Sequence, residues 1–228
     1  MVINMYNYEI ETKKINIYCE SSNKALPLVI INSYDSDGLE IWEACKKNGC
    51  FDLILVNISN LDWNNDLSIS EFKLFKDNFG GKALNYLDFL TNKVIPSIQE
   101  IVRSKLNKEI LYITIGGYSL AGLFSLYACF NSDIFKRVFS ISGSLWYPGI
   151  KDYVLSHKIS ENIDKIYLSL GDKEAIVKNE VLNKVEDNTN IIYNHLSKNI
   201  NTIYELNSGN HFYDSVNRIV NGIMEIIK

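Results

Sequence analysis

The sequence predicts an α/β protein with a mainly parallel central sheet, an antiparallel hairpin at its N-terminal edge and helices on both faces. Three observations support this fold class. Short, continuously apolar runs recur along the chain, as is typical of parallel strands that are buried on both faces. Apolar stripes with helical spacing lie between these runs. The first twenty residues instead alternate apolar and polar side chains, which indicates a half-buried antiparallel pair.

The expected strands follow in chain order. Residues 6–10 and 15–19 alternate on either side of a polar segment and predict the hairpin. Six apolar runs then predict the parallel strands, at residues 28–31, 53–56, 110–115, 138–141, 166–170 and 203–206. In such sheets ligands bind beyond the carboxyl ends of the strands, so functional residues are expected in the loops that follow these runs.

Helices are expected in the intervals. One stripe runs from residue 87 to 102, and Pro96 within it predicts a kink or two short helices. Further stripes predict helices over 177–198 and from 216 to 227. Residues 57–81 show no clear period and carry four large aromatic side chains, which either cover a site or pack on the sheet edge.

The composition bounds the class of protein. A chain of 228 residues with 46% hydrophobic content suits one α/β domain over residues 1–228. The net charge of −4 and the absence of a basic block argue against nucleic-acid binding. The sequence shows no secretion signal and no apolar run long enough to span a bilayer, so a cytoplasmic protein is expected. Its four cysteines are then expected to be reduced core thiols, and their spacing predicts no metal site.

One stretch, residues 110–130, organises the functional prediction. An apolar run is followed by Gly116, Gly117, Tyr118 and Ser119, and then by an apolar segment of helical length. A serine on a sharp turn between strand and helix is exposed at the sheet edge, near a helix N-terminus where negative charge is stabilised. Glycines suit the strained backbone of such a turn. Ser119 is therefore a candidate nucleophile, although serine at a helix start is equally typical of an N-cap.

A nucleophilic serine needs a general base, and the chain has three histidines. His157 lies in a polar context and is expected to be exposed. His195 lies beside the apolar stripe of an expected helix, which favours a partly buried structural role. His211 follows the last expected strand and precedes the last expected helix, which places it at the carboxyl edge of the sheet together with Ser119. Position therefore favours His211 as the base.

The acid that orients the base is expected after the strand between the serine and the histidine, since α/β-hydrolases place the three residues in the order serine, acid, histidine. The expected strand at 166–170 ends in Gly171, Asp172, Lys173 and Glu174, so two carboxylates stand in the right place. An aspartate directly after a turn commonly bonds its own local backbone. This favours Glu174 as the orienting acid and leaves Asp172 as the alternative.

Four segments together resemble a known family. They are Gly-Tyr-Ser-Leu-Ala-Gly at 117–122, residues 140–148, residues 168–174 and Gly-Asn-His at 209–211. In this order they resemble the esterase branch of the α/β-hydrolases that includes enterochelin esterases and esterase D. The resemblance runs from about residue 28 to the C-terminus. It departs from the family pattern at Ala121, where glycine is usual and where alanine is expected to crowd the turn.

The resemblance implies an α/β-hydrolase fold in which Ser119 is the nucleophile, His211 the base and Glu174 the acid. It further implies an oxyanion hole from the backbone N–H groups of Leu120 and of Tyr34, which lies in the loop 32–35. The side chains expected to contact the substrate are Tyr118, Trp63, Trp146 and Tyr147.

The implied activity is that of a serine carboxylic-ester hydrolase, which forms an acyl-enzyme from a small or medium ester without a cofactor or metal. Two rivals remain. One is an acyltransferase on the same fold, in which an alcohol replaces water. The other is a catalytically silent binding protein that retains the fold. The expected partner is a small-molecule ester, with no nucleic acid and no membrane, and the oligomeric state is not predicted.

Overall fold

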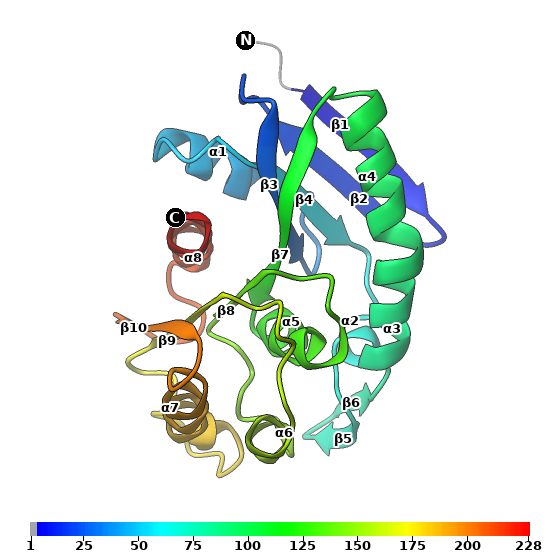
Figure 1. Cartoon of the computed structure of the whole chain (residues 1–228). Helices are drawn as coiled ribbons and strands as arrows, with labels where there is room; N and C mark the ends of the chain where they lie inside the picture. Colours follow the sequence, from blue (N-terminus) through cyan, green and yellow to red (C-terminus); the bar gives the residue numbers. More distant parts are fainter. Residues whose placement is uncertain (1–3) are drawn as a thin grey trace.

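The central sheet has the mixed character that the sequence predicts (Figure 1). The computed structural model describes residues 4–228. Strands β1 (Asn4–Ile10) and β2 (Lys13–Cys19) form the antiparallel hairpin. β2 then pairs antiparallel with β4 (Ile54–Ser59), which joins the hairpin to the rest of the sheet.

All further pairs in this sheet are parallel. Its eight strands lie in the order β1-β2-β4-β3-β7-β8-β9-β10. The remaining strands are β3 (Ala25–Asn32), β7 (Glu109–Tyr118), β8 (Arg137–Ile141), β9 (Lys165–Gly171) and β10 (Asn201–Asn207). In register, Asn32 lies opposite Gly117, and Asn207 lies opposite Gly171. The carboxyl ends of the parallel strands therefore meet at one edge, where open parallel sheets bind their ligands.

Helices cover both faces of the sheet (Figure 1). On one face, α1 (Leu39–Lys47) and α8 (Ser215–Ile227) pack against each other. The other face carries α3 (Ala83–Phe89), α4 (Ile95–Ser104), α5 (Leu120–Asn131), α6 (Ile150–Ser156) and α7 (Val185–Leu196). Every residue of α5 from Leu120 to Cys129 is buried, so this helix is a fixed base for the turn that precedes it.

Some predicted helix boundaries differ from the structure. The stripe at 87–102 forms α3, a π-helical turn (Leu90–Val94) and α4 in one continuous helical run, and Pro96 follows just after the π-helical turn. The helix expected over 177–198 is too long, because α7 begins only at Val185 after a short 3₁₀ turn (Leu182–Lys184). Three short helices, α1, α2 (Trp63–Asp66) and α6, are not among the predicted ones; left-handed glycines, Gly38 and Gly149, precede α1 and α6.

The segment 57–81 contains a short helix, α2 (Trp63–Asp66), and a separate hairpin of β5 (Glu71–Leu74) and β6 (Asp77–Gly80). Phe72 and Phe79 stack on each other and both pack edge-on against Tyr147, with ring centroids 5.6 and 5.5 Å from it. These two aromatics therefore anchor the hairpin to the body of the protein.

Two expectations from composition concern the described residues. Cys19, Cys45, Cys50 and Cys129 are all buried and form no disulfide, in agreement with the prediction of core thiols. Within residues 4–228, no helix combines the length and the apolar character that crossing a bilayer requires.

Candidate active site

Ser119 occupies a strained turn between β7 and α5. Its backbone has φ 59° and ψ −122°, on the side of the Ramachandran map that residues other than glycine rarely adopt. The Ser119 carbonyl accepts hydrogen bonds from the N–H groups of Gly122, Leu123 and Ser144, at 3.0, 3.1 and 3.0 Å. The Ser119 N–H donates to the carbonyl of Ile141 at 3.0 Å. These bonds hold the strained backbone in place and leave the side chain at the sheet edge.

Alanine at position 121 fits the turn because position 117 is glycine. Ala121 is fully buried. A Cβ built on Gly117 would lie only 2.5 Å from the Cβ of Ala121 and 3.0 Å from its carbonyl carbon. The crowding expected from Ala121 is therefore real, and the missing side chain of Gly117 accommodates it.

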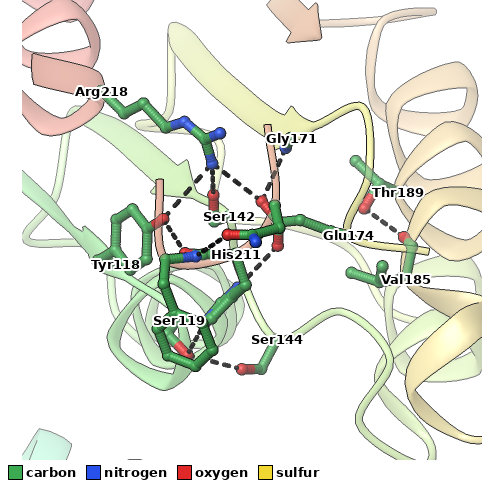
Figure 2. A network of polar contacts seen from close by, with 12 residues as sticks. Tyr118, Ser119, Ser142, Ser144, Gly171, Glu174, Val185, Thr189, His211 and Arg218 are labelled. Atoms are coloured by element: carbon green, nitrogen blue, oxygen red, sulfur yellow. Dashed lines mark hydrogen bonds and ion pairs between the residues drawn. The ribbon is translucent and has the colours of Figure 1, made fainter. Parts of the chain in front are cut away.

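Three side chains from three loops form a continuous hydrogen-bonded chain (Figure 2). His211 Nε2 lies 3.0 Å from Ser119 Oγ. His211 Nδ1 lies 2.7 Å from Glu174 Oε2. The Glu174 side chain is 3% exposed and the His211 side chain 29% exposed, so the chain runs from a buried carboxylate to a solvent-accessible hydroxyl. The structure thus brings together the serine, base and acid candidates.

The other two histidines lie apart from this chain. His157 is exposed and stacks on Tyr153, while His195 is partly buried in α7. Both line a separate cavity that does not include Ser119. Their expected positions are therefore confirmed.

Asp172 has a different partner from the one expected. Its Oδ1 accepts a hydrogen bond at 2.8 Å from the N–H of Gly209, 37 residues further along the chain. The interpretation that it bonds its own local backbone is wrong, because the parallel pairing of β9 with β10 brings the two following loops together. Asp172 braces the loop that carries His211, whereas Glu174 contacts the imidazole itself.

A buried arginine that the sequence analysis missed lies behind Glu174 (Figure 2). Arg218 is 3% exposed, and its Nη1 lies 3.1 Å from Glu174 Oε1 and 3.0 Å from Ser142 Oγ. Nη2 donates to the carbonyl of Ser208 at 2.9 Å. Glu174 Oε1 also accepts a hydrogen bond from the N–H of Gly171 at 2.7 Å. Arg218 therefore ties the acid to the loop before His211, and these bonds compensate the burial of both charges.

No helical pattern in the sequence points to Arg218. It lies two residues after Val216 and two before Val220 in α8, so helical spacing places it off the apolar stripe. Its burial depends instead on the contact with Glu174.

Charge and tautomer follow from these contacts. Burial alone would raise the pKa of Glu174, but the hydrogen bond and charge of His211, with further donors, outweigh burial and hold that pKa below its ordinary value. Glu174 is therefore ionised at neutral pH and accepts the Nδ1–H of His211, which leaves Nε2 free to accept a proton from Ser119.

Tyr118 fixes the histidine from the other side. Its hydroxyl donates to the backbone carbonyl of His211. Burial raises the pKa of Tyr118, so the phenol stays protonated and remains a donor. Tyr118 also lines the cavity described next, where its ring lies 5.4 Å from that of His211.

A cavity of about 510 Å³ lies beside Ser119 and His211. Among the side chains predicted to contact substrate, Tyr118 and Trp63 line it, together with Tyr34. The rings of Tyr34 and Trp63 meet edge to face, with centroids 5.5 Å apart. The cavity continues between the loop after β3 and the start of α8, where Ile41, Val216 and Ile219 supply apolar surface.

The other two predicted substrate contacts lie outside this cavity. Tyr147 is only 1% exposed, and its hydroxyl donates to the carbonyl of Ser70 at 2.7 Å, so the prediction that it lines the pocket is wrong. Trp146 is half-buried against Phe79 and is not among the lining residues. The reason is the β5–β6 hairpin, which packs over these two rings.

Comparison with known proteins assigns the family. The model of the family described as "Putative esterase" matches residues 41–220. The chain belongs to this family. The match includes the Ser119 turn, the loop of Glu174 and the loop of His211.

Single proteins of known sequence or structure share a low sequence identity with this chain. It is 29% identical over 108 residues to "Uncharacterized protein YbbA" of Bacillus subtilis (strain 168), a match that spans 46% of this chain and 41% of YbbA. The siderophore hydrolase EstB from Aspergillus nidulans superposes with a TM-score of 0.76 at 18% identity, over 99% of this chain and 95% of EstB. The enterochelin esterase from Shigella flexneri gives 0.69 at 14% identity, over 98% and 57% of the two chains. These structural similarities show the α/β-hydrolase fold.

The backbone N–H groups expected to form an oxyanion hole lie near Ser119. Leu120 is the first residue of α5, so its N–H has no carbonyl partner within the helix. Asn32 pairs with Gly117 in register, so Tyr34 and Ser119 leave neighbouring parallel strands at the same level. Tyr34 and Ser119 also line the same cavity.

Proposed function

We propose that this protein is a serine carboxylic-ester hydrolase that works through an acyl-enzyme. The observation that carries the proposal is the hydrogen-bonded chain from Glu174 through His211 to Ser119, at a strained turn between a strand and a helix. Membership of an esterase family supports the same reaction class. Fold alone would not, because one fold hosts many activities.

In the proposed first step, Ser119 Oγ attacks the ester carbonyl while His211 Nε2 accepts its proton. Glu174 stabilises the imidazolium that forms and keeps the ring in the reactive orientation. The negative charge on the carbonyl oxygen is stabilised by the N–H groups of Leu120 and Tyr34. Loss of one such donor typically costs about 2.7–4 kcal/mol of transition-state stabilisation.

To complete acylation, the imidazolium gives its proton to the alcohol oxygen as the ester C–O bond breaks, and the acyl group stays on Ser119. A water molecule then takes the place of the alcohol, and His211 accepts a proton from it as it attacks the acyl group on Ser119. The carboxylic acid leaves and Ser119 regains its proton. Each step uses only these side chains, the backbone donors and water.

The direct test is hydrolysis of 4-nitrophenyl acetate and butyrate by the wild type and by Ser119→Ala. We expect kcat to fall by about 10⁴- to 10⁶-fold, as for nucleophile removal in other serine hydrolases, with an unchanged Tm. The exposed Ser156→Ala on α6 is the matched control and should keep full activity. Undiminished hydrolysis by Ser119→Ala would contradict the proposal.

Product analysis with added alcohols separates hydrolysis from acyl transfer. The proposal expects the free carboxylic acid as the main product at ordinary alcohol concentrations. If a new ester is the main product instead, the acceptor is an alcohol and the reaction is acyl transfer.

A further inference from the structure

The cavity beside Ser119 is lined by carboxylates and aromatic rings. Asp35 and Glu40 both line it, and both side chains are exposed. Trp63 and Tyr34 form an aromatic wall next to Asp35. None of the residues lining this cavity, all within the described part of the chain, is lysine or arginine.

A second cavity, which shares the aromatic wall, repeats this pattern. It has a volume of about 440 Å³ and shares Tyr34, Asp35 and Trp63 with the first. It adds a further carboxylate, Asp62, and again its lining residues, drawn from the described ones, include no lysine or arginine. Carboxylates therefore line both cavities that the two rings share.

A third cavity, of about 540 Å³, extends the first one between α1 and α8. It shares Glu40 and Phe212 with the first, and adds Asp214 and, on the last turn of α1, Lys47. Among the described residues that line these three cavities, Lys47 is thus the single lysine or arginine, against four carboxylates. Within residues 4–228, none of these four carboxylates forms an ion pair with a lysine, arginine or histidine.

Carboxylates and aromatic rings together favour a positively charged ligand. A cleft lined by one sign of charge raises the local concentration of the opposite ion and repels ions of its own sign. The faces of tryptophan and tyrosine rings also attract ammonium groups, and they do so more strongly when part of the cation's water shell is removed. An aromatic wall with carboxylates beside it therefore suits a positively charged nitrogen.

We propose that this site acts on esters that carry a positively charged nitrogen close to the ester group, and that it discriminates against anionic esters. The ester carbonyl lies at Ser119, and the cationic group lies against Trp63 and Tyr34, within reach of Asp35 and Glu40. This inference rests on the proposed esterase function and goes beyond it by assigning the class of substrate.

The test uses three thioesters of butyric acid whose leaving side carries a cation, no charge or an anion: butyrylthiocholine, its neutral analogue 3,3-dimethylbutyl thiobutyrate, and S-butyryl-3-mercaptopropionate. Each rate is divided by that of hydroxide-catalysed hydrolysis to remove differences in leaving-group reactivity. A second series of 4-nitrophenyl esters places the charge on the acyl side: 4-(trimethylammonio)butyrate, 5-methylhexanoate and the glutarate monoester. We expect kcat/KM to fall from cation to neutral to anion in the series whose variable group occupies the cavity. The ratio should shrink at high ionic strength.

Charge-removing variants connect the preference to the cavity. Asp35→Asn and Glu40→Gln should each reduce the cation-to-anion ratio by about two- to fivefold, the size expected for exposed charge pairs. Glu43→Gln is the matched control, because it changes net charge equally on the same helix but lies outside the cavities. It should leave the ratio unchanged.

The outcomes separate this inference from the proposed function. If all esters in both series are hydrolysed at rates independent of charge, the charge preference is wrong and the esterase stands. If anionic esters are preferred, or if the cation preference survives both charge-removing variants, the assignment of Asp35 and Glu40 is overturned. If no ester is cleaved and Ser119 takes no fluorophosphonate label, the proposed function itself fails.

Discussion

The turn that carries Ser119 and the two loops that carry Glu174 and His211 are built in different ways. The turn is held by backbone hydrogen bonds and by the close approach of Gly117 to Ala121. The loops are held by side chains from distant segments. Asp172 bonds Gly209, and Arg218 bonds both Glu174 and the carbonyl of Ser208.

This difference shows which contacts fix the position of each catalytic side chain. The position of the nucleophile is a property of a short local segment packed on a buried helix. The position of the base and acid depends on a few long-range polar contacts. Changes that crowd the backbone of the turn should therefore reduce stability and activity together, whereas changes in the loops should separate the two.

The largest effect is expected for the base. His211→Ala removes the group that accepts the proton of Ser119, so kcat/KM for a 4-nitrophenyl ester should fall by about 10⁴-fold or more. His157→Ala and His195→Ala are the controls, because both residues line a different cavity. Near-normal activity of His211→Ala would show that another group is the base.

The two carboxylates after β9 should differ next. Glu174→Gln removes the acceptor of the imidazole Nδ1–H, and we expect kcat to fall by about 10²- to 10³-fold. This loss is smaller than the roughly 10⁴-fold loss in the best-known triad, because Asp172 and Tyr118 still position the loop of His211.

Asp172→Asn keeps the size of the side chain and should lower kcat only a few-fold, with a lower Tm. Steady-state kinetics and thermal unfolding of both variants decide the matter. If Asp172→Asn loses most of its activity at an unchanged Tm while Glu174→Gln stays active, Asp172 is the orienting acid and Glu174 is not.

Arg218 should act on stability more than on kcat. Arg218→Met leaves the buried Glu174 carboxylate without its cation, which typically costs about 3–5 kcal/mol of folding free energy. We expect kcat to fall about tenfold, because Glu174 keeps its hydrogen bonds to His211 and Gly171. Arg218→Lys retains a charge but only part of the contact geometry, so its stability and kcat should lie between those of the wild type and Arg218→Met.

The dependence of Tm on pH distinguishes the loss of the Arg218 charge from a simple loss of packing. Burial raises the pKa of Glu174, but the contact with His211 lowers it. In the folded protein Glu174 therefore has a pKa below its ordinary value. Its stabilising contribution is therefore complete above the ordinary value, about 4.3, and is lost as pH falls through the lowered pKa. Removing the Arg218 cation should raise the pKa of Glu174, so the Tm of Arg218→Met should depend less on pH between 5 and 3 than the Tm of the wild type. Parallel Tm curves for wild type and Arg218→Met would contradict this role.

A smaller effect on folding free energy than that of Arg218→Met is expected when the turn is overpacked. Gly117→Ala places a Cβ against Ala121, and such overpacking typically costs about 1–3 kcal/mol. Because the turn carries the nucleophile, activity should fall along with Tm. Adding Ala121→Gly removes the Cβ of residue 121, which makes the closest contact at 2.5 Å, and should restore part of the stability and of the activity. A Gly117→Ala variant that loses stability but keeps full activity would break the link between the turn and the nucleophile.

The same distinction explains what could be predicted from the sequence. The parallel strands, the N-terminal hairpin and the Ser119 turn depend on neighbouring residues, and local patterns indicate them. Parallel topology then places the loop of His211 beside that turn. Arg218 and the true partner of Asp172 depend on which loops meet in space. Tyr147 was misplaced for the same reason, because the hairpin at 71–80 packs over it. In the segment before α7, Val177 and Val181 are spaced as in a helix but precede it.

Labelling with a fluorophosphonate, followed by peptide mass spectrometry, tests the central claim most directly. Ser142 and Ser144 are the nearest competing hydroxyls; Ser144 Oγ lies 3.3 Å from Ser119 Oγ and Ser142 Oγ contacts Arg218. We predict one adduct per chain, on Ser119, absent from Ser119→Ala and formed far more slowly in His211→Ala. A label on Ser142 or Ser144, or no label on the folded wild type, would contradict the account.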